Sequence, residues 1–403
     1  MKKTAIAAAL CLAAALLPAG AAAADVTGPP VVNAPVFNDP VADSGTPGTP
    51  SAQQSAVMDQ LIRLIRAARA GGEIRFVMFE FTEGQRSTEV ADALIAAHGR
   101  GVKVKVILNG SDKNAPVAAR LRSALGGSES AASYVVSCPA GRGCIARNYL
   151  HSKFATFSGI EAGGVTHDKV VFVTSSNLTD WYLYNSYNDA YTFTDATVYD
   201  GYHRYFDDLR TGRDRAPDPG YFWATPTGSK HKALFLPRAK NSGDHIANVL
   251  KLVECGYRDT DGVKRQTDVR LALTAFNQHR KAIAQELVRL RGKGCWVDVV
   301  YYQNNMDDTI RAELAKTASN GLRIQLTPCR FTAGDRSVVP HTKLMMTDGF
   351  YDDDITPRVY TGSANFTHLE NADDSIVRIS GRDVHDQYLS YFYKIRDTCR
   401  ART

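Results

Sequence analysis

Two patterns of apolar and polar residues follow one another along the chain. Residues 73–81 (EIRFVMFEF) and 102–108 (VKVKVIL) alternate apolar with polar side chains, and this alternation predicts strands. Residues 55–70 and 87–100 carry apolar side chains at helical spacing, and Gly101 ends the second of these expected helices. Strands that alternate with helices predict an α/β fold.

The same order of elements occurs twice. In the first part we expect strands over 36–38, 73–81, 102–108, 134–137, 170–174 and 191–193, and helices over 55–70, 87–100, 116–125 and 199–210. In the second part we expect strands over 234–236, 268–276, 297–302, 323–327 and 358–361, and helices over 244–254, 280–291 and 307–318. Each part therefore predicts one α/β sandwich.

Composition divides the chain into five segments. We expect a signal peptide over 1–24, a Pro/Gly-rich segment over 25–55, a first half over 56–214, a Pro/Gly-rich joint over 215–229 and a second half over 230–403. In the first segment, Lys2 and Lys3 precede an apolar run over 5–17 and a run of small residues, which is typical of a secretory signal cleaved near Ala24. A spanning helix needs roughly 20 apolar residues, so this run is too short for an anchor. We expect a secreted protein, either extracellular or periplasmic.

Six Cys remain once Cys11 leaves with the signal. An even number of Cys in an exported chain predicts disulfides, and Cys138–Cys144 is the pair that we expect, with the other pairings open. No close C-x-x-C pair points to zinc, and we expect no metal and no other cofactor. The formal net charge is +6, or +4 without Lys2 and Lys3, and the dense basic runs of a dedicated nucleic-acid binder are missing from the sequence.

Each part also carries a His-x-Lys triplet on an expected strand, followed by an apolar strand and a Ser-x-Asn triplet. The members are His151, Lys153, Ser175 and Asn177 in the first copy, and His341, Lys343, Ser363 and Asn365 in the second. The His residues lie 190 positions apart and the Asn residues 188. Such constant offsets indicate an internal duplication. We expect the two halves to pack as a pseudo-dimer with one shared active site, and a monomeric protein.

These residue types suit a phosphodiester. One His can attack phosphorus and form a covalent intermediate, while the second His gives its proton to the leaving alcohol. Two Lys and two Asn or Ser donors can bind the non-bridging oxygens and offset their charge. A His-x-Lys triplet alone is uninformative, because His279–Lys281 forms a third one on an expected helix, without a downstream Ser-x-Asn.

The two copies resemble the phospholipase D superfamily, whose signature is His-x-Lys-x4-Asp followed by Gly-Ser/Gly-x-Asn, usually twice per chain. The resemblance covers nearly all of the mature chain. The second copy matches throughout, with Asp348 and Gly362 in place. In the first copy Ser158 stands at the Asp position and Thr174 at the Gly position, which puts the stability or tuning of that half in doubt more than its chemistry.

The resemblance implies roles for several residues. It makes His151 the nucleophile and His341 the general acid and base, with Asp348 supporting the site. The family also orients each His with an acidic residue shortly after the Asn. Asp373 and Asp189 are the candidates for this role, and the alternative is that both simply begin a strand.

Three functions are open from the sequence. The leading one is a secreted phospholipase D that hydrolyses the head-group ester of phospholipids at a membrane surface to phosphatidate, with transfer to an alcohol acceptor as a corollary. The alternative is a metal-independent nuclease of the same superfamily, with nucleic acid as its partner. The third is a non-catalytic phosphate- or lipid-binding protein, which the degenerate first motif suggests.

Overall fold

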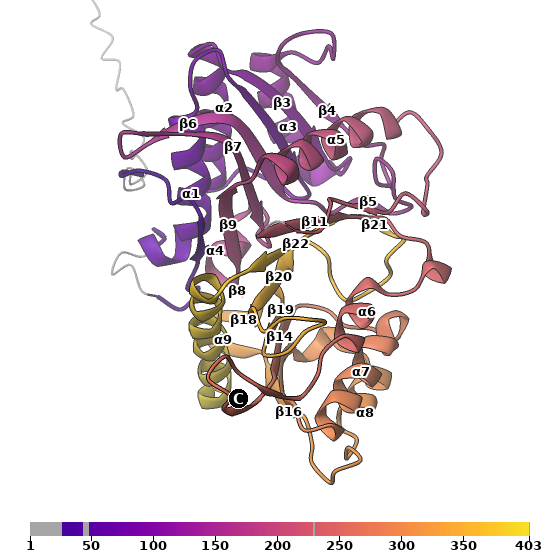
Figure 1. Cartoon of the computed structure of the whole chain (residues 1–403). Coiled ribbons are helices and arrows are strands. Elements are labelled where there is room, and N and C mark those ends of the chain that lie inside the picture. The colour runs from indigo at the N-terminus through magenta and orange to yellow at the C-terminus, as the bar shows by residue number, and fades with distance from the viewer. Residues whose placement is uncertain (1–25, 43–47, 229, 403) are drawn as a thin grey trace, which may run out of the picture.

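The structure is a computed structural model that describes residues 26–42, 48–228 and 230–402 (Figure 1). The expected signal peptide, residues 1–24, lies outside these residues. The chain folds into two similar halves, which Figure 1 shows as an upper N-terminal and a lower C-terminal lobe.

A seven-stranded mixed sheet forms the first half, with the order β1-β9-β7-β6-β2-β3-β4. Parallel pairing joins β2, β3 and β4, and antiparallel pairing joins the other strands. The strands are β1 (Ala34–Phe37), β2 (Glu73–Met78), β3 (Lys103–Leu108), β4 (Tyr134–Ser137), β6 (Phe154–Ala162), β7 (Val165–Thr174) and β9 (Asp189–Thr194).

Three helices cover the outer face of this sheet and share one apolar core with it. They are α1 (Ala52–Ala67), α2 (Ser87–Gly99) and α3 (Ala115–Leu125). Ser51 and Gln54 form a capping box, which explains where α1 begins, because the box satisfies backbone N–H groups that lack a helical acceptor. The short helix α4 (Asp180–Tyr184) follows β7, and α5 (Ala196–Gly212) packs on the inner face.

The second half repeats this plan in an eight-stranded sheet of order β10-β11-β22-β20-β19-β14-β15-β16. Its strands are β10 (Trp223–Ala224), β11 (His231–Phe235), β14 (Asp268–Leu273), β15 (Trp296–Tyr302), β16 (Gln325–Cys329), β19 (Lys343–Asp348), β20 (Arg358–Gly362) and β22 (Ser375–Ser380). Its helices are α6 (His245–Lys251), α7 (Lys281–Gly292), α8 (Asp308–Leu314) and α9 (Arg382–Arg402). A hairpin of β12 (Gly256–Arg258) and β13 (Lys264–Gln266) stands apart from the sheet.

Short strands join the halves at two places. β5 (Tyr149–Leu150) of the first half pairs in parallel with β21 (Ala372–Asp373) of the second, and the two lie side by side in Figure 1. β8 (Ser186–Tyr187) pairs in parallel with β18 (Arg336–Pro340), which also pairs with β17 (Phe331–Ala333). One apolar cluster takes in the inner faces of both sheets together with α5 and α9. The duplicated α/β architecture is thereby confirmed.

The sequence pattern did not predict α9. Its buried residues Val384, Tyr388, Phe392 and Ile395 recur at helical spacing, and polar residues between them lower its overall hydrophobicity. α9 is the counterpart of α5, because both pack in the cluster between the two sheets.

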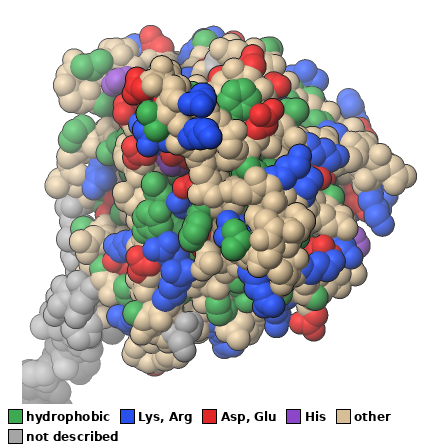
Figure 2. Space-filling model, turned by 60° about the horizontal axis from the view of Figure 1, so that its bottom comes forward, with side chains coloured by type: hydrophobic (Ala, Val, Ile, Leu, Met, Phe, Trp, Pro, Cys, Tyr) green, Lys and Arg blue, Asp and Glu red, His purple; other side chains and the backbone are tan. Residues whose placement is uncertain are grey.

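Three disulfides are present among the described residues. The expected Cys138–Cys144 pair is confirmed, and Cys255–Cys295 and Cys329–Cys399 are the others. Within the described residues, no helix combines the length and the apolar character needed to cross a bilayer. Figure 2 shows one face of the molecule, on which Lys and Arg side chains lie among hydrophobic and acidic ones.

Candidate active site

Each catalytic candidate His lies between two strands, immediately after a short strand that pairs with the opposite half. His151 follows β5, and its backbone N–H donates to the carbonyl oxygen of Asp373 (2.9 Å). His341 follows β18, and its backbone N–H donates to the carbonyl oxygen of Tyr187 (2.9 Å). The expected position of each His within one continuous strand is therefore wrong. The break in the strand lets the opposite half bind the backbone beside each imidazole.

The opposite half also orients each ring. The Nδ1 atom of His151 lies 2.9 Å from Oδ1 of Asp374, and Nδ1 of His341 lies 2.9 Å from Oδ1 of Asn188. The amide of Asn188 is placed with its oxygen toward His341, because its Nδ2 donates to the carbonyl oxygen and the hydroxyl of Ser186. Both partners of the His rings are acceptors, so each Nδ1 carries hydrogen and each Nε2 is left for chemistry.

The two Lys are held in the same manner in both halves. Nζ of Lys153 donates to the carbonyl oxygen of His151 (2.6 Å), and Nζ of Lys343 donates to that of His341 (2.6 Å). Lys343 also donates to Oγ1 of Thr274 (2.8 Å). Both Lys side chains are buried. The structure therefore brings both expected His-x-Lys pairs together in one site.

Burial shapes the electrostatics of this site. Burial and the nearby Lys153 lower the pKa of His151 to about 4, although Asp374 opposes the shift. Burial, with Lys343, Lys153 and His151 close by, lowers the pKa of His341 well below its ordinary value. Burial lowers the pKa of Lys153 to about 7 and that of Lys343 well below its usual range. An anionic substrate would reverse these shifts, because its charge favours the protonated forms.

The Ser residues of the motifs support the residues that hold the imidazoles. Ser175 lies within 3.3 Å of Oδ1 of Asn188, and Ser363 lowers the pKa of Asp374 by a side-chain hydrogen bond. Asn177 is buried and its Oδ1 accepts from the backbone N–H of Glu80 (3.4 Å). The fourth residue, Asn365, is half-buried, and its backbone carbonyl accepts from Arg280 (3.4 Å).

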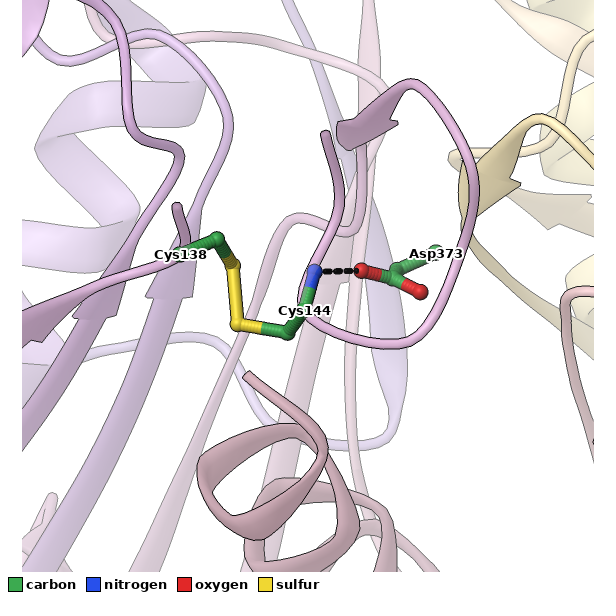
Figure 3. Close-up of side chains that lie close together, drawn as sticks. All are labelled: Cys138, Cys144 and Asp373. Carbon is green, nitrogen blue, oxygen red and sulfur yellow. Dashed lines mark hydrogen bonds between the residues drawn. A yellow bond between two sulfur atoms is a disulfide. The ribbon is translucent and has the colours of Figure 1, made fainter. Parts of the chain in front are cut away.

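The expectation that Asp373 and Asp189 orient the imidazoles is wrong. In each half the residue that contacts the ring is the immediate neighbour in the sequence. Asp373 turns away from His151, and its carboxylate accepts from the backbone N–H groups of Cys144, Ile145 and Ala146 (Figure 3). Asp189 accepts instead from Thr361 and Tyr388. Neighbours along an extended backbone point to opposite sides, so in each pair only one residue can face the imidazole. Asp374 and Asn188 are those residues.

The motif Asp of the second copy lies outside the site. Asp348 is at the end of β19 and forms a bidentate ion pair with Arg382 at the start of α9 (2.6 and 2.8 Å). Asp348 therefore attaches α9 to the sheet and does not contact the site directly, although the resemblance implied that it supports the site. In the first half, Ser158 at the same motif position accepts from the backbone N–H of Glu73 (2.8 Å), so it joins β6 to β2.

Aromatic side chains that the sequence analysis did not assign flank both imidazoles. The Phe79 and Tyr149 rings lie 5.0 and 5.8 Å from the His151 ring, and the Tyr182 ring lies 4.8 Å from the His341 ring. Trp181 contacts Tyr182 and is 44% exposed. Phe79 lies within the expected strand 73–81 and directly follows β2 in the structure, and the signal for Tyr182 was its place just after the Ser-x-Asn motif.

One group of side chains among the described residues has the donors to hold a metal ion, namely Cys138, Cys144 and Asp373. It does not fit a metal, because both sulfur atoms form the disulfide and the carboxylate already accepts backbone N–H groups (Figure 3). Asp373 and the disulfide loop instead form a rigid support beside Asp374.

Comparisons with known proteins agree with this geometry. The family model described as "Cardiolipin synthase, PLD-like domain" matches residues 61–210 and 264–396. No curated protein matches the sequence. A solved structure of phosphatidylserine synthase from Haemophilus influenzae Rd KW20 is similar over 93% of this chain and 88% of that chain, at 14% identity and a TM-score of 0.57.

A polyphosphate kinase structure from Porphyromonas gingivalis is similar over 86% of this chain, at 15% identity and a TM-score of 0.54. The likeness covers 49% of that kinase, so the chain spans about half of its length. At such identities these structures show the fold alone. The family match covers more than half of the chain, and the chain therefore belongs to this family of PLD-like domains, within the phospholipase D superfamily.

Proposed function

We propose that the chain is a phosphodiesterase of the phospholipase D type, which cleaves the head-group ester of phospholipids through a phosphohistidine at His151. The observation that carries this proposal is the pair of imidazoles, one from each half, each with its Nδ1 bound and its Nε2 left for chemistry beside two buried Lys. This arrangement suits in-line displacement at a phosphorus atom without a metal.

The different partners of the two rings support the assignment of roles. Nε2 of His151 attacks phosphorus, and the positive charge that forms on this ring is offset by the carboxylate of Asp374. The head-group oxygen leaves with the proton from Nε2 of His341. The partner of this ring at Nδ1, Asn188, is neutral, so it stabilises the protonated imidazole less than a carboxylate would and leaves it more acidic. A water molecule then gives a proton to Nε2 of His341 while its oxygen attacks phosphorus, which releases phosphatidate and restores His151.

The Lys side chains supply the electrostatic part of this reaction. Nζ of Lys153 and Nζ of Lys343 lie against the backbone of the two His residues, and we expect both to bind phosphate oxygens between the rings. Their ammonium groups offset the charge that develops on the non-bridging oxygens. The phosphoenzyme also accepts an alcohol in place of water, which gives transphosphatidylation.

A phospholipid at a membrane surface is the proposed substrate, and an exported monomer is the proposed form of the protein. The family description names a lipid synthase, and the aromatic side chains beside both imidazoles, with exposed Trp181 next to them, suit an apolar substrate. Three disulfides fit an oxidising compartment. On the face that Figure 2 shows, Lys and Arg side chains lie among acidic and hydrophobic ones.

The test is incubation of the purified protein with phosphatidylcholine and ethanol in EDTA. We expect choline, phosphatidate and phosphatidylethanol, and loss of all three products in His151→Ala and in His341→Ala. The matched control is His279→Ala, since His279 belongs to the third His-x-Lys triplet and lies exposed, and this variant keeps full activity.

Two outcomes would overturn the proposal. Choline release without phosphatidylethanol at high ethanol would contradict the covalent route. Cleavage of plasmid DNA in EDTA, with no release of choline, would establish the nuclease instead.

A further inference from the structure

A cavity of about 550 Å³ lies on the outer face of the second sheet, away from the His residues. Strands β11, β20 and β22, the loop between β19 and β20 and Val249 of α6 surround it. Four basic side chains line it: Lys230, Lys232, Arg358 and Arg378. The first half has no such group of cations at the equivalent positions of its sheet.

The registers of the two sheets identify the equivalent residues. A row of cross-strand partners on β1, β9 and β7 in the first half corresponds to a row on β11, β22 and β20 in the second. These rows are Ala34, Thr192 and Phe172 in the first half, and Lys232, Arg378 and Tyr360 in the second. In the next row, Val170 opposite Thr194 corresponds to Arg358 opposite Ser380. Small and apolar residues of one half are thus replaced by three cations in the other.

The covering helix differs between the halves in the same place. In the first half α1 has 16 residues, and Gln60 on it donates to Oγ1 of Thr192 (3.0 Å), so Thr192 is buried. Its counterpart α6 has 7 residues. The shorter helix leaves this part of the sheet open, and Arg358 and Arg378 stand where the first half has the buried residues Val170 and Thr192.

Arg358 is the most buried of the four basic side chains, and several contacts hold its guanidinium group in place. Its side chain is 6% exposed, pairs with Asp354 (2.6 Å), donates to the carbonyl oxygen of Thr356 (2.9 Å) and lies 4.1 Å over the ring of Tyr351. Its Nε atom is buried and has no hydrogen-bond partner among the described residues. A buried guanidinium N–H without an acceptor is unfavourable, so the geometry points to an acceptor bound in the cavity.

The charges in the cavity favour an anion. Three carboxylates also line it: Asp354 pairs with Arg358, and Asp352 and Asp353 are exposed to solvent. Lys230, Lys232 and Arg378 also line the cavity, so its four cations exceed its three carboxylates. Burial and the like charge of the neighbouring Arg378 lower the pKa of Lys232.

We propose that this cavity binds a small phosphate-bearing ligand, at a site separate from that of His151 and His341. A phosphate group has enough oxygens to accept from Arg358, Arg378 and Lys232 at once, and guanidinium groups match phosphate geometry. Free phosphate and the phosphate of a lipid head group share this chemistry. The inference does not depend on the reaction proposed above.

The test in solution is equilibrium dialysis with radiolabelled inorganic phosphate at constant ionic strength. The variant Lys232→Ala/Arg378→Thr gives the cavity the residues of the first half, and we expect it to lose one phosphate per chain or to bind it at least tenfold more weakly. The control Lys103→Ala/Arg122→Thr removes the same charges from exposed positions and keeps wild-type binding. A second experiment with phosphatidate vesicles distinguishes a lipid head group from free phosphate as the ligand.

The site is located by soaking crystals of the wild-type protein in tungstate. An anomalous peak within hydrogen-bond distance of Arg358 or Arg378 supports the proposal, even if the double variant fails to fold. Equal binding by the wild type and the double variant in both binding experiments, or tungstate at the His residues and nowhere in the cavity, would overturn it.

Discussion

At the scale of single residues, the two imidazoles differ in the charge of their partners. His151 faces the carboxylate of Asp374, whereas His341 faces the amide of Asn188. The two partners occupy equivalent places, because Asp374 lies between β21 and β22 and Asn188 between β8 and β9. The two halves therefore bind Nδ1 of each ring in the same way but with partners of different charge. This difference suits a ring that gains positive charge and a ring that gives up a proton.

Two substitutions give each imidazole the kind of partner that the other one has. The first should lower kcat, and the second should change the dependence of kcat on pH. Asp374→Asn removes a charged hydrogen bond worth about 1.5–3 kcal/mol, so kcat should fall about 10- to 100-fold. Asn188→Asp places a carboxylate beside His341 and raises its lowered pKa, so the acid form persists to higher pH. The alkaline limb of the pH–rate profile should then move up by about one unit or more.

The control for the second substitution is Asn185→Asp. Asn185 lies on the same loop but donates to the carbonyl oxygen of Ser337, away from the imidazole. A profile of kcat against pH measures all three variants. An alkaline limb that stays in place in Asn188→Asp would contradict the role of Asn188 in setting the acidity of His341.

At the scale of elements, the short strand β21 links a disulfide loop to the site. The carboxylate of Asp373 binds the loop closed by Cys138–Cys144 (Figure 3). The next residue, Asp374, binds His151. Burial raises the pKa of Asp373 to about 7, and the backbone N–H groups oppose this shift. The position of the imidazole therefore depends on the contact between loop and strand.

Removal of this carboxylate should destabilise the whole fold. Asp373→Ala leaves the N–H groups of Cys144, Ile145 and Ala146 buried without an acceptor, at about 1–3 kcal/mol each. We expect the free energy of unfolding in urea to fall by about 3 kcal/mol or more, with a smaller loss in Asp373→Asn. Activity should fall with it, because Asp374 directly follows β21.

The control is Glu370→Ala, which removes a partly exposed ion pair with Arg147 from the same loop. Such a pair is worth about 1 kcal/mol or less. If Asp373→Ala unfolds at the same urea concentration as Glu370→Ala, the carboxylate does not support the loop.

At the scale of the whole molecule, the halves are interdependent. Strand pairs β5–β21 and β8–β18 cross between them, and one apolar cluster contains residues from both sheets. Each His is oriented by a residue of the opposite half, so neither half holds a complete site. Duplication thus gave one chain what a symmetric dimer would supply from two.

Separate expression of the halves tests this dependence. Fragments 26–214 and 215–402 should each lack a cooperative thermal transition, because each exposes its share of the common apolar cluster. Co-expressed fragments should purify together and recover activity. A cooperative transition in either fragment alone, followed by circular dichroism, would show that the halves fold independently.

The sequence by itself determined the architecture and most of the site. Alternating and helical patterns placed most strands and helices of both halves, though not α9, because burial of one face imposes a period on each element. Repetition of His-x-Lys and Ser-x-Asn at nearly constant offsets identified the duplication and the residues His151, Lys153, His341 and Lys343. The Cys138–Cys144 pair followed from a short loop rich in Gly and Pro.

Only the tertiary structure decided which residues complete the site. Asp373 and Asp374 are neighbours, as are Asn188 and Asp189, and the choice within each pair depends on which side of the backbone faces the other half. That direction is set by contacts between residues about 150 or 220 positions apart, which no local pattern contains. The same holds for the cavity at Arg358, which is open because α6 is shorter than its counterpart α1. This difference becomes visible only when equivalent faces of the two folded sheets are compared.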